Sequence, residues 1–430
     1  MKRSMSNPLG AIAVLAVVSL ALSGCGREAD TGKGGPGAGD AIDDKAATGT
    51  VDVWAMGAEG DILGDFVKDF ETANPDATVN VTAVPWEAAH TKIANAIASG
   101  KGPDVSLIGT TWMGEFAQAG GLDPTPEGLV DEADFFEGAW GSTVVNDTSY
   151  GVPWFVETRV LYYRADLAAE AGWDEAPQNW DELKQFATDL EAKAGVDTGI
   201  SLQPGQTGSW QTVLPFAWSN GAEVTNATGT EYTIDSPEMT EALDYYKSFF
   251  DEGLSETRTL DPGELEGGFA DGTYGSFISG PWMTGVVEDA GVAPEDYAVA
   301  LLPGKDAAPG TSFVGGGDLA VFKDSDNRES AWKFVKWLSE PEVQQKFYET
   351  VGDLPAVKSA WDSGKLAEDP QLQVFGAQLD SALAPPAVPT WEEVAAVVDS
   401  DVEQAVKGAT PVDEAITHMQ SQAESIGTGL

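Results

Sequence analysis

Cysteine and histidine are almost absent from this chain of 430 residues, which contains one cysteine and two histidines. A lone thiol cannot form a disulfide within the chain, so any folded domain depends on its apolar core. The two histidines, His90 and His418, are too few for a histidine-rich zinc site or a serine–histidine–aspartate triad. The composition therefore argues against both kinds of catalytic site, and we expect no metal or cofactor.

Basic residues are also scarce, because 23 Lys and Arg oppose 70 Asp and Glu and give a formal net charge of −47. Such a field repels nucleic acid and anionic lipid, which makes both poor partners. The acidic residues are spread through a chain that is 42% hydrophobic, which is typical of a solvated acidic surface on a globular fold. An uncharged ligand is unaffected by this field, whereas a cationic ligand stays an alternative.

Long apolar runs are missing except near the start of the chain, at residues 9–22. This run follows Lys2 and Arg3, is too short to span a bilayer comfortably, and precedes small residues that suit a cleavage site. These features predict a secretory signal over residues 1–24 that is removed from the mature protein.

The signal ends in Leu22-Ser23-Gly24-Cys25, which resembles the bacterial lipoprotein box. In that motif cleavage falls before the cysteine, and diacylglycerol is attached to its thiol. The resemblance implies that Cys25 is the mature N-terminus and a lipid anchor at the outer face of the cell membrane. The alternative is an ordinary signal peptide followed by an incidental free cysteine.

The next segment is rich in Gly, Ala and Asp and has almost no large apolar residue. Such a composition cannot bury enough surface to offset the entropy of ordering. We therefore expect residues 25–49 to form a flexible linker. Apolar periodicity begins at Thr50, and the roughly 380 residues that remain suit two domains or one large one.

Strand and helix patterns alternate after Thr50. Apolar residues recur at every second position near residues 51–55 and at helical spacing over residues 61–70. A strand over 78–84, a helix over 86–99 and a strand over 104–108 complete a βαβαβ order, which predicts a parallel sheet. Ligands bind beyond the carboxyl ends of such strands, so the loops of interest are residues 56–60, 85–86 and 109–113.

Later segments are mostly helical. A serine cap and a proline at the first helical position start a helix after Ser236. Further helices are expected over residues 327–338 and 342–348 and across most of residues 391–426.

Several short motifs then occur in a characteristic order: Thr50-Val-Asp-Val-Trp54, Lys68-Asp-Phe-Glu71 with Asn74-Pro75, Val84-Pro-Trp86, Ile97-Ala-Ser-Gly100 with Pro103-Asp104-Val105, Gly109-Thr-Thr-Trp112, Gly151-Val-Pro-Trp154, Ser279-Gly-Pro-Trp282 and Gly315-Gly-Gly-Asp-Leu-Ala320. Their order resembles the extracellular solute-binding proteins of bacterial ABC importers, in particular family 1, the maltodextrin-binding-protein-like sugar-binding lipoproteins. The resemblance runs from Thr50 to the C-terminus.

The resemblance implies an α/β fold, the two-lobed periplasmic-binding-protein-like fold of type II, with a ligand cleft between lobes that hinge crossings join. The crossings are expected near Val156, Phe313 and Leu354. The first lobe then comprises residues 50–155 and 314–353, and the second comprises residues 156–313 and 354–430.

The resemblance also implies a function without catalysis. A monomeric lipoprotein outside the cytoplasm captures a neutral di- or oligosaccharide, such as the α-glucosides maltose or trehalose, and delivers it to ABC permease subunits in the membrane. One alternative is a lipid-anchored glycoside hydrolase, which needs only two carboxylates across a sugar cleft. The other is the same fold binding a polyamine or another non-sugar solute.

Tryptophan is abundant, with 14 residues, and pyranose rings stack well on indole through their C–H faces. Trp86, Trp112, Trp154 and Trp282 each lie in an expected loop that is flanked by Pro or Gly, where a side chain can face a cleft. We expect these four to contact the ligand. The alternative for each is packing in the core or at its rim.

Sugar hydroxyls need polar partners, and charge-assisted hydrogen bonds are the stronger kind. The candidate carboxylates and cation are Glu59, Glu157, Arg159 and Asp318. Glycines allow close backbone approach and hydroxyls can donate, so the ligand-contact candidates also include Gly316, Gly317, Thr110 and Thr111. For Glu157 and Arg159 the alternative is a surface ion pair. Asp104, in a Pro-Asp-Val turn, is expected to cap backbone donors instead.

Overall fold

The computed structural model describes residues 39–430. The expected signal segment and the lipidation site Cys25 lie outside these residues. Within residues 39–430, every helix is too short or too polar to cross a membrane.

The largest sheet has seven strands in the order β11-β6-β10-β3-β1-β2, and β12 pairs with β10 beside this path. Its strands are β1 (Gly49–Met56), β2 (Ala77–Val84), β3 (Val105–Gly109), β6 (Val152–Thr158), β10 (Ser312–Val321), β11 (Leu354–Pro355) and β12 (Ala382–Leu383). The β3-β1-β2 part is parallel, as the βαβαβ pattern predicts. β10 and β6 extend it in antiparallel pairing, which gives a mixed sheet.

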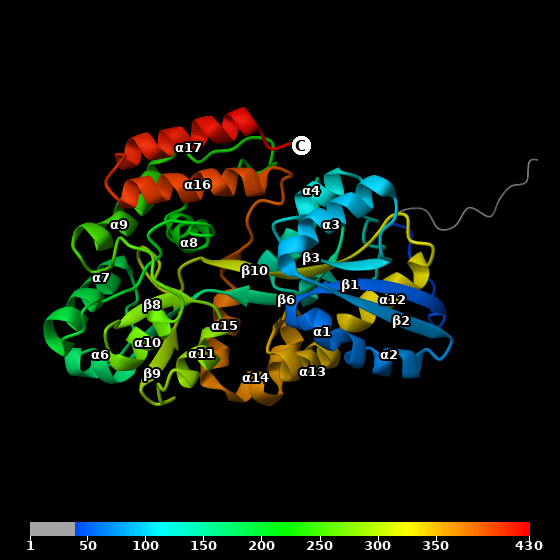
Figure 1. Cartoon of the computed structure of the whole chain (residues 1–430), viewed down its shortest axis with the longest axis horizontal. Coiled ribbons are helices and arrows are strands. Elements are labelled where there is room, and N and C mark those ends of the chain that lie inside the picture. Colours follow the sequence, from blue (N-terminus) through cyan, green and yellow to red (C-terminus); the bar gives the residue numbers. More distant parts are fainter. Residues whose placement is uncertain (1–38) are drawn as a thin grey trace, which may run out of the picture. The chain divides into compact units, whose positions relative to one another are not determined.

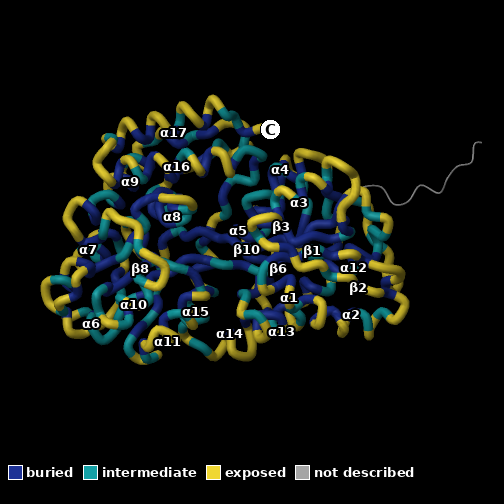
Figure 2. The backbone as a smooth tube through the Cα atoms, viewed as in Figure 1, coloured by how far each residue is buried: buried dark blue, intermediate teal, exposed yellow. Residues whose placement is uncertain are grey.

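Burial follows the strand periodicity. In β1 the side chains of Val51 and Val53 are fully buried while that of Asp52 is exposed, because successive residues point to opposite faces. All of β3 is buried, as expected for a strand covered on both faces. Figure 2 shows the middle of this sheet, around β3 and β10, buried at the centre of the fold, with exposed residues along the outer faces of the helices.

A second sheet has three antiparallel strands in the order β8-β7-β9. The remaining strands are β4 (Val144–Val145), β5 (Thr148–Ser149), β7 (Val160–Arg164), β8 (Ser276–Ser279) and β9 (Tyr297–Ala300). β4 and β5 form a small hairpin apart from both sheets.

The helices that pack around the large sheet or lead from it are α1 (Gly57–Phe66), α2 (Lys68–Ala73), α3 (Trp86–Ser99), α4 (Met113–Gln118), η1 (Glu132–Asp134), α5 (Glu137–Ser142), α12 (Arg328–Leu338) and α13 (Pro341–Val351). The helix expected over residues 86–99 has these bounds. Met56 ends β1 and residues 57–60 are the first turn of α1, so the loop expected at residues 56–60 is wrong, and Trp86 likewise begins α3.

A second group of helices forms its own apolar core, in which Tyr246, Trp391 and Val402 are fully buried. Its members and those beside the three-stranded sheet are α6 (Ala165–Ala171), α7 (Trp180–Asp189), η2 (Leu190–Ala194), α8 (Trp210–Ser219), α9 (Pro237–Asp251), α10 (Glu264–Asp271), α11 (Met283–Asp289), α16 (Trp391–Val406) and α17 (Val412–Ile426). The Ser236 hydroxyl caps α9 by accepting from the backbone N–H of Met239, 3.1 Å away. The expected capped helix is confirmed.

β6 and β10 lie side by side between these two groups of elements, and we call them the crossing strands (Figure 1). β6 continues almost directly into β7 of the smaller sheet, and β11 pairs with β6 at Val156. β6, β10 and β11 come from distant parts of the chain and pair next to one another. They contain Val156, Phe313 and Leu354, near which the sequence predicts the three crossings.

The chain after Leu354 first stays with the elements of the large sheet. Val357 forms a bridge with Phe135, and the ring of Trp361 lies 6.1 Å from that of Phe136. The passage to the smaller sheet follows through η3 (Lys358–Asp362), α14 (Gly364–Glu368) and α15 (Pro370–Leu379). These contacts keep residues 357–361 beside the elements of the large sheet.

The last part of the expected flexible linker is ordered and packs against the folded domain. Ala47 is buried, Ile42 packs against the core, and the carboxylate of Asp43 pairs with Lys333 on α12. The Thr48 N–H donates to the Ser330 hydroxyl at 3.0 Å, just before β1 starts at Gly49. The prediction of a flexible linker is therefore wrong for residues 40–49, because side chains of α12 supply the contacts that composition alone does not reveal.

Candidate ligand-binding site

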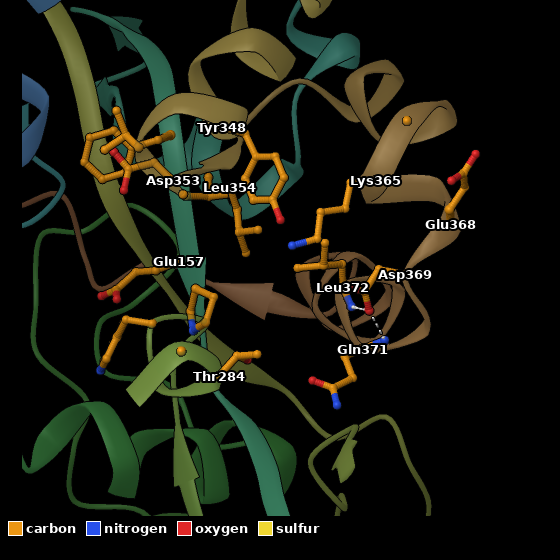
Figure 3. Close-up of a pocket in the computed structure, with 18 of the residues that line it drawn as sticks. Glu157, Thr284, Tyr348, Asp353, Leu354, Lys365, Glu368, Asp369, Gln371 and Leu372 are labelled. Atoms are coloured by element: carbon orange, nitrogen blue, oxygen red, sulfur yellow. Dashed lines mark hydrogen bonds between the residues drawn. The ribbon is translucent and has the colours of Figure 1, made fainter. Parts of the chain in front are cut away.

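A cavity of about 1080 Å³ lies beside the crossing strands. Its walls combine polar, aromatic and aliphatic groups from α1, β6, α11, α13, β11, α14 and α15. Among its lining residues are Glu59, Glu157, Trp282, Tyr348, Asp353, Lys365 and Asp369. Figure 3 shows the Tyr348 and Lys365 side chains directed toward the same space. Strands of the large sheet and helices beside both sheets therefore line one cavity.

The crossing strand β6 carries Glu157, and Arg159 follows directly after it. The Arg159 Nη1 donates to Glu157 Oε2 at 3.0 Å, and Nη2 donates to Gln211 Oε1 at 2.7 Å. Arg159 is buried, whereas Glu157 is half-buried and lines the cavity. The two residues form an ion pair, as the surface-pair alternative supposed, but the pair lies at the cavity and not on an outer surface.

Trp282 is the most exposed large apolar side chain among the described residues, at 48%. It precedes α11 and forms part of the cavity wall. The Arg159 guanidinium carbon lies 4.7 Å from the centroid of its ring. The open indole in the cavity wall offers a surface on which a ligand with an apolar face can stack.

Two carboxyl groups meet in the cavity wall. Glu59, in the first turn of α1, and Asp353, just before β11, both line the cavity and their carboxyl groups interact. Burial raises the pKa of Glu59, and burial together with the charges of Glu59 and Glu157 raises the pKa of Asp353 to about 8. Asp353 Oδ2 is buried without a protein partner in the described chain, so it can form a hydrogen bond with a ligand hydroxyl.

An aromatic group continues from Glu59 along the carboxyl ends of β2 and β3. A Cβ placed on Gly57 would lie 2.7 Å from both Glu59 Oε2 and Trp86 Nε1, so Trp86 adjoins Glu59. The Trp86 and Trp112 rings lie 5.6 Å apart, edge to face. Both are half-buried, and they pack on one another at the edge of the sheet where ligands of parallel sheets bind.

A second cavity, of about 410 Å³, lies on the far side of Gln211. Thr111, Gln206, Gln211, Trp210, Glu392 and Asp399 are among its lining residues. Asp399 accepts hydrogen bonds from the Gly208 and Trp210 N–H groups and from the Ser209 hydroxyl, which anchors this loop. Because Gln211 lines this cavity and bonds Arg159, the second cavity adjoins the Glu157–Arg159 pair.

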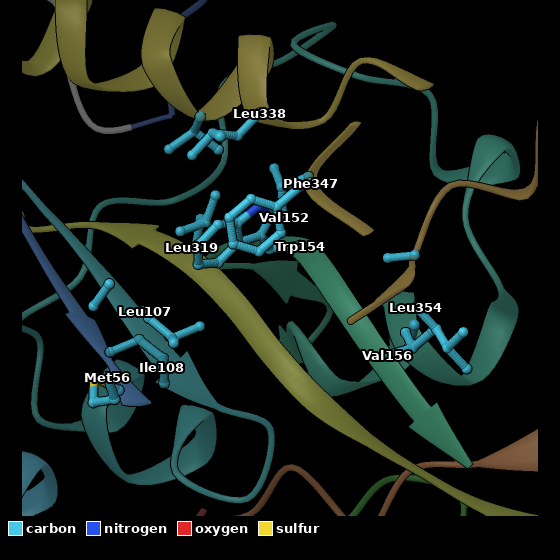
Figure 4. Close-up of a cluster of buried hydrophobic side chains, with 14 of the residues drawn as sticks. Met56, Leu107, Ile108, Val152, Trp154, Val156, Leu319, Leu338, Phe347 and Leu354 are labelled. Atoms are coloured by element: carbon cyan, nitrogen blue, oxygen red, sulfur yellow. The ribbon is translucent and has the colours of Figure 1, made fainter. Parts of the chain in front are cut away.

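Trp154 does not lie in an open loop. It is inside β6, only 1% exposed, and its ring lies 4.6 Å from that of Phe347 (Figure 4). The glycine and proline before it made a loop the natural expectation. Alternation along the strand instead turns Trp154 into the core, so it is removed from the set of ligand contacts.

Asp318, which the sequence predicts to contact the ligand, also lies away from both cavities. It is 1% exposed, lies within β10, and accepts from the Ser142 hydroxyl at 3.1 Å. Burial raises its pKa to about 8. Neither described cavity touches it, so its role is in the sheet.

Of the glycines and threonines predicted to contact the ligand, only Thr111 lines one of the two cavities. Gly316 and Gly317 belong to β10, where a bulge separates Gly317 from Asp318, and neither lines the two cavities. Thr110 is buried at the end of β3, while Thr111 lines the second cavity. Asp104 acts as expected, because its carboxylate accepts from the Asp52 N–H at 2.8 Å.

Sequence reasoning missed several cavity residues, namely Gln211, Tyr348, Asp353, Lys365 and Asp369. Asp353 had a usable signal, because it directly precedes the expected crossing at Leu354. Gln211, Tyr348 and Lys365 lie in helices, and Asp369 caps α15; the relation of these helices to the crossing strands appears only in the folded chain. Among residues 39–430, His, Cys, Asp and Glu form no cluster that could hold a metal ion.

Two α/β sheets, joined by crossing strands and sharing a cavity with an exposed indole and carboxyl groups, define a solute-binding receptor. The profile of the bacterial extracellular solute-binding proteins matches residues 56–345, and the chain belongs to this family. The family resemblance and the two-lobed fold expected from the sequence are thus confirmed.

Individual binding proteins are similar to this chain over most of its length. A binding protein of Brucella abortus is 30% identical over 373 residues, covering 85% of this chain and 90% of that one. The diacetylchitobiose binding protein DasA of Streptomyces coelicolor is 28% identical, covering 96% of each chain. The solved structure of the sugar-binding protein MalE of Xanthomonas citri superposes with a TM-score of 0.81 at 32% identity, covering 88% of this chain and 97% of that one.

This group comprises sugar- and oligosaccharide-binding proteins of ABC transporters, which act outside the cytoplasm together with permease subunits. Its members are binding proteins and not enzymes.

Proposed function

We propose that this protein captures a neutral di- or oligosaccharide in the cavity beside its crossing strands and delivers it to an ABC permease. The observation that carries the proposal is the 48% exposed indole of Trp282 in a wall that also holds Glu59, Glu157 and Asp353. An apolar ring face beside carboxyl acceptors matches a sugar, which has C–H faces and a rim of hydroxyls. The named ligand of DasA and the sugar-binding MalE support the same ligand class.

The size of the cavity supports a ligand that is longer than one sugar ring. A cavity of about 1080 Å³ is at the upper end of ordinary small-molecule sites, and the second cavity adjoins it at Gln211. This extent favours more than one sugar ring. An α-glucoside such as maltose or trehalose is the specific candidate.

Capture couples to transport through lobe movement. The cavity is lined by α1 and α13 beside the large sheet and by α11 and α15 beside the smaller one. A sugar that contacts both groups stabilises their closed arrangement over the open one. The closed form is the form that docks on the permease, while the lobe boundaries at residues 155/156 and 313/314 are where we place the hinges.

The test is calorimetric titration of the mature protein with maltose, trehalose, β-linked disaccharides, xylo-oligosaccharides and spermidine. We expect one-to-one binding of an oligosaccharide, a smaller radius of gyration by solution scattering, and chemically unchanged sugar. Trp282→Ala should weaken binding at least tenfold, equivalent to about 1.4 kcal/mol, because the stacking surface is lost.

Trp218→Ala is the matched control, because Trp218 is a half-buried tryptophan of α8 outside both cavities. Its affinity should equal that of the wild type. Formation of sugar product would favour the glycoside hydrolase, and binding of spermidine alone would favour a non-sugar receptor. Either result overturns the proposal.

A further inference from the structure

An exposed indole is useful for recognition only if its orientation is already set. Immobilising a rotamer-rich side chain during binding costs about 0.5–1.5 kcal/mol, and a ring held beforehand avoids most of that cost. Trp282 is 48% exposed, yet two groups contact its ring, Gly280 on its own loop and Arg159 beside the crossing strands.

The indole folds back over Gly280. A Cβ placed on Gly280 would lie 2.1 Å from Cζ3 and 2.4 Å from Cη2 of Trp282, so only a residue without a side chain leaves room for the ring. Gly280 does not have a positive φ, so the requirement is for space and not for backbone freedom. Its carbonyl accepts from the buried Tyr162 hydroxyl at 2.8 Å, which holds the backbone beneath the ring.

Arg159 contacts the same ring. Its guanidinium carbon lies 4.7 Å from the Trp282 centroid and 5.5 Å from that of Phe313, while Glu157 and Gln211 accept from its two terminal nitrogens. The Arg159 N–H donates to the Ser312 hydroxyl, and that hydroxyl donates to the Arg159 carbonyl. A buried guanidinium with this many fixed partners has little freedom, and it stacks on aromatic faces in a way that an ammonium does not.

We propose that Gly280 and Arg159 are positioning residues that hold the Trp282 indole in its binding orientation before the ligand arrives. Arg159, which the sequence analysis placed among ligand contacts, then acts through Trp282 and Glu157. One guanidinium bonds Glu157 and contacts the indole. Arg159 therefore fixes the position of the apolar part of the site relative to its polar part. The ligand identity rests on the proposed function, whereas the positioning of the ring does not.

The first test is a double-mutant cycle on sugar affinity. Gly280→Ala should weaken binding about tenfold, close to the effect of Trp282→Ala, because it displaces the ring from its place. In the Trp282→Ala background the same substitution should add almost nothing, since coupled residues are not additive. Gly267→Ala is the control, because Gly267 lies on α10 with open space at its Cβ.

The second variant keeps the charge and removes the planar group. Arg159→Lys should weaken binding at least threefold in the wild type and much less in the Trp282→Ala background. Arg164→Lys is the matched control, because Arg164 pairs with Asp166 and bonds α10 backbone carbonyls away from the cavity. Effects of Gly280→Ala and Arg159→Lys that add fully to that of Trp282→Ala would overturn the proposal.

A ligand-free measurement separates this proposal from the sugar assignment. In 5-fluorotryptophan-labelled protein, the Trp282 ¹⁹F resonance is assigned by its loss in Trp282→Phe. Gly280→Ala and Arg159→Lys should each shift or broaden that resonance, and Gly267→Ala should leave it in place. If these shifts occur while no sugar binds, the positioning stands and the proposed ligand class fails. An unchanged Trp282 resonance in both variants overturns the positioning.

Discussion

Tryptophans with similar sequence neighbours have opposite environments in this protein. Trp154 and Trp282 both follow proline, yet Trp154 is 1% exposed and Trp282 is 48% exposed. The difference arises because Trp154 is an inward position of β6, while Trp282 precedes a short helix beside a cavity. The two residues should therefore respond to substitution through different quantities, stability for one and affinity for the other.

Trp154→Ala should lower the free energy of unfolding by about 3–5 kcal/mol, because it removes a large buried side chain that packs on Phe347. Trp154→Phe should cost less, because the Trp154 Nε1 is a buried donor without a protein partner in the described chain and phenylalanine removes it. Urea unfolding measures both. A sugar affinity that falls tenfold in a fully folded Trp154→Phe would contradict the core assignment.

Two buried carboxyl groups make the stability of this protein depend on pH. Burial raises the pKa of Asp318 to about 8, and burial with neighbouring carboxylates raises the pKa of Asp353 to about 8, against 3.8 for an ordinary aspartate. The native protein therefore keeps protons that the unfolded chain releases above pH 4. Stability from these groups is fully present below that pH and falls as the pH rises toward 8, by at most about 1.4 kcal/mol per pH unit for each group.

Asp318→Asn should flatten this dependence, because asparagine keeps the shape, can still accept from Ser142, and does not ionise. We expect the variant to lose less stability than the wild type between pH 5 and pH 8, measured by urea unfolding at each pH. Asp61→Asn, at an exposed position of α1, is the control and should follow the wild type. Equal slopes for Asp318→Asn and wild type would show that burial does not keep this carboxyl protonated.

At the scale of elements, the crossing strands depend on close backbone approach. Gly316 has φ +122°, and a Cβ there would lie 2.2 Å from the Phe155 carbonyl oxygen. This position pairs with Val156, one residue before the cavity-lining Glu157. The glycine run is therefore explained by strand pairing at the crossing and not by contact with the ligand.

Gly316→Ala should destabilise the fold by more than about 1 kcal/mol, because alanine is strained at positive φ and its Cβ collides with β6. Gly141→Ala, in α5 with open space at its Cβ, should change stability little. Thermal unfolding compares the two. If Gly316→Ala unfolds at the wild-type temperature, β10 and β6 are not held as closely as the structure shows.

Local patterns predicted the elements well where neighbouring residues determine the outcome. The bounds of α3, the parallel β3-β1-β2 order and the cap of α9 follow from periodicity and capping residues within one segment. Prediction failed for residues 57–60 and 40–49. Residues 40–49 take their structure from partners far along the chain, such as Lys333 for Asp43.

At the scale of the whole molecule, an acidic receptor with net charge −47 gains little from attraction to a negatively charged membrane surface. A lipid at Cys25 would supply that attachment, and tethering raises the local concentration of the receptor near its permease.

Cys25→Ser should release the protein from the membrane fraction into the medium or periplasm, because serine cannot form the thioether to diacylglycerol. Sugar affinity in solution should equal that of wild-type protein cleaved from its anchor. Fractionation with immunoblotting measures release, and mass spectrometry of the wild-type N-terminus measures the lipid. A wild-type protein that lacks the lipid, or a Cys25→Ser variant that stays membrane-bound, would contradict the anchor.

The sequence by itself determined the family, the acidic character, the order of the first strands and helices, and the set of residue types from which a sugar site is built. Only the tertiary structure decided that Trp282 and not Trp154 is exposed at the cavity, that Asp353 meets Glu59, and that Arg159 lies against Trp282. Periodicity and capping act between near neighbours and are readable in one segment. The cavity is made by segments that meet only when the crossing strands pair, and that pairing is a property of the whole fold.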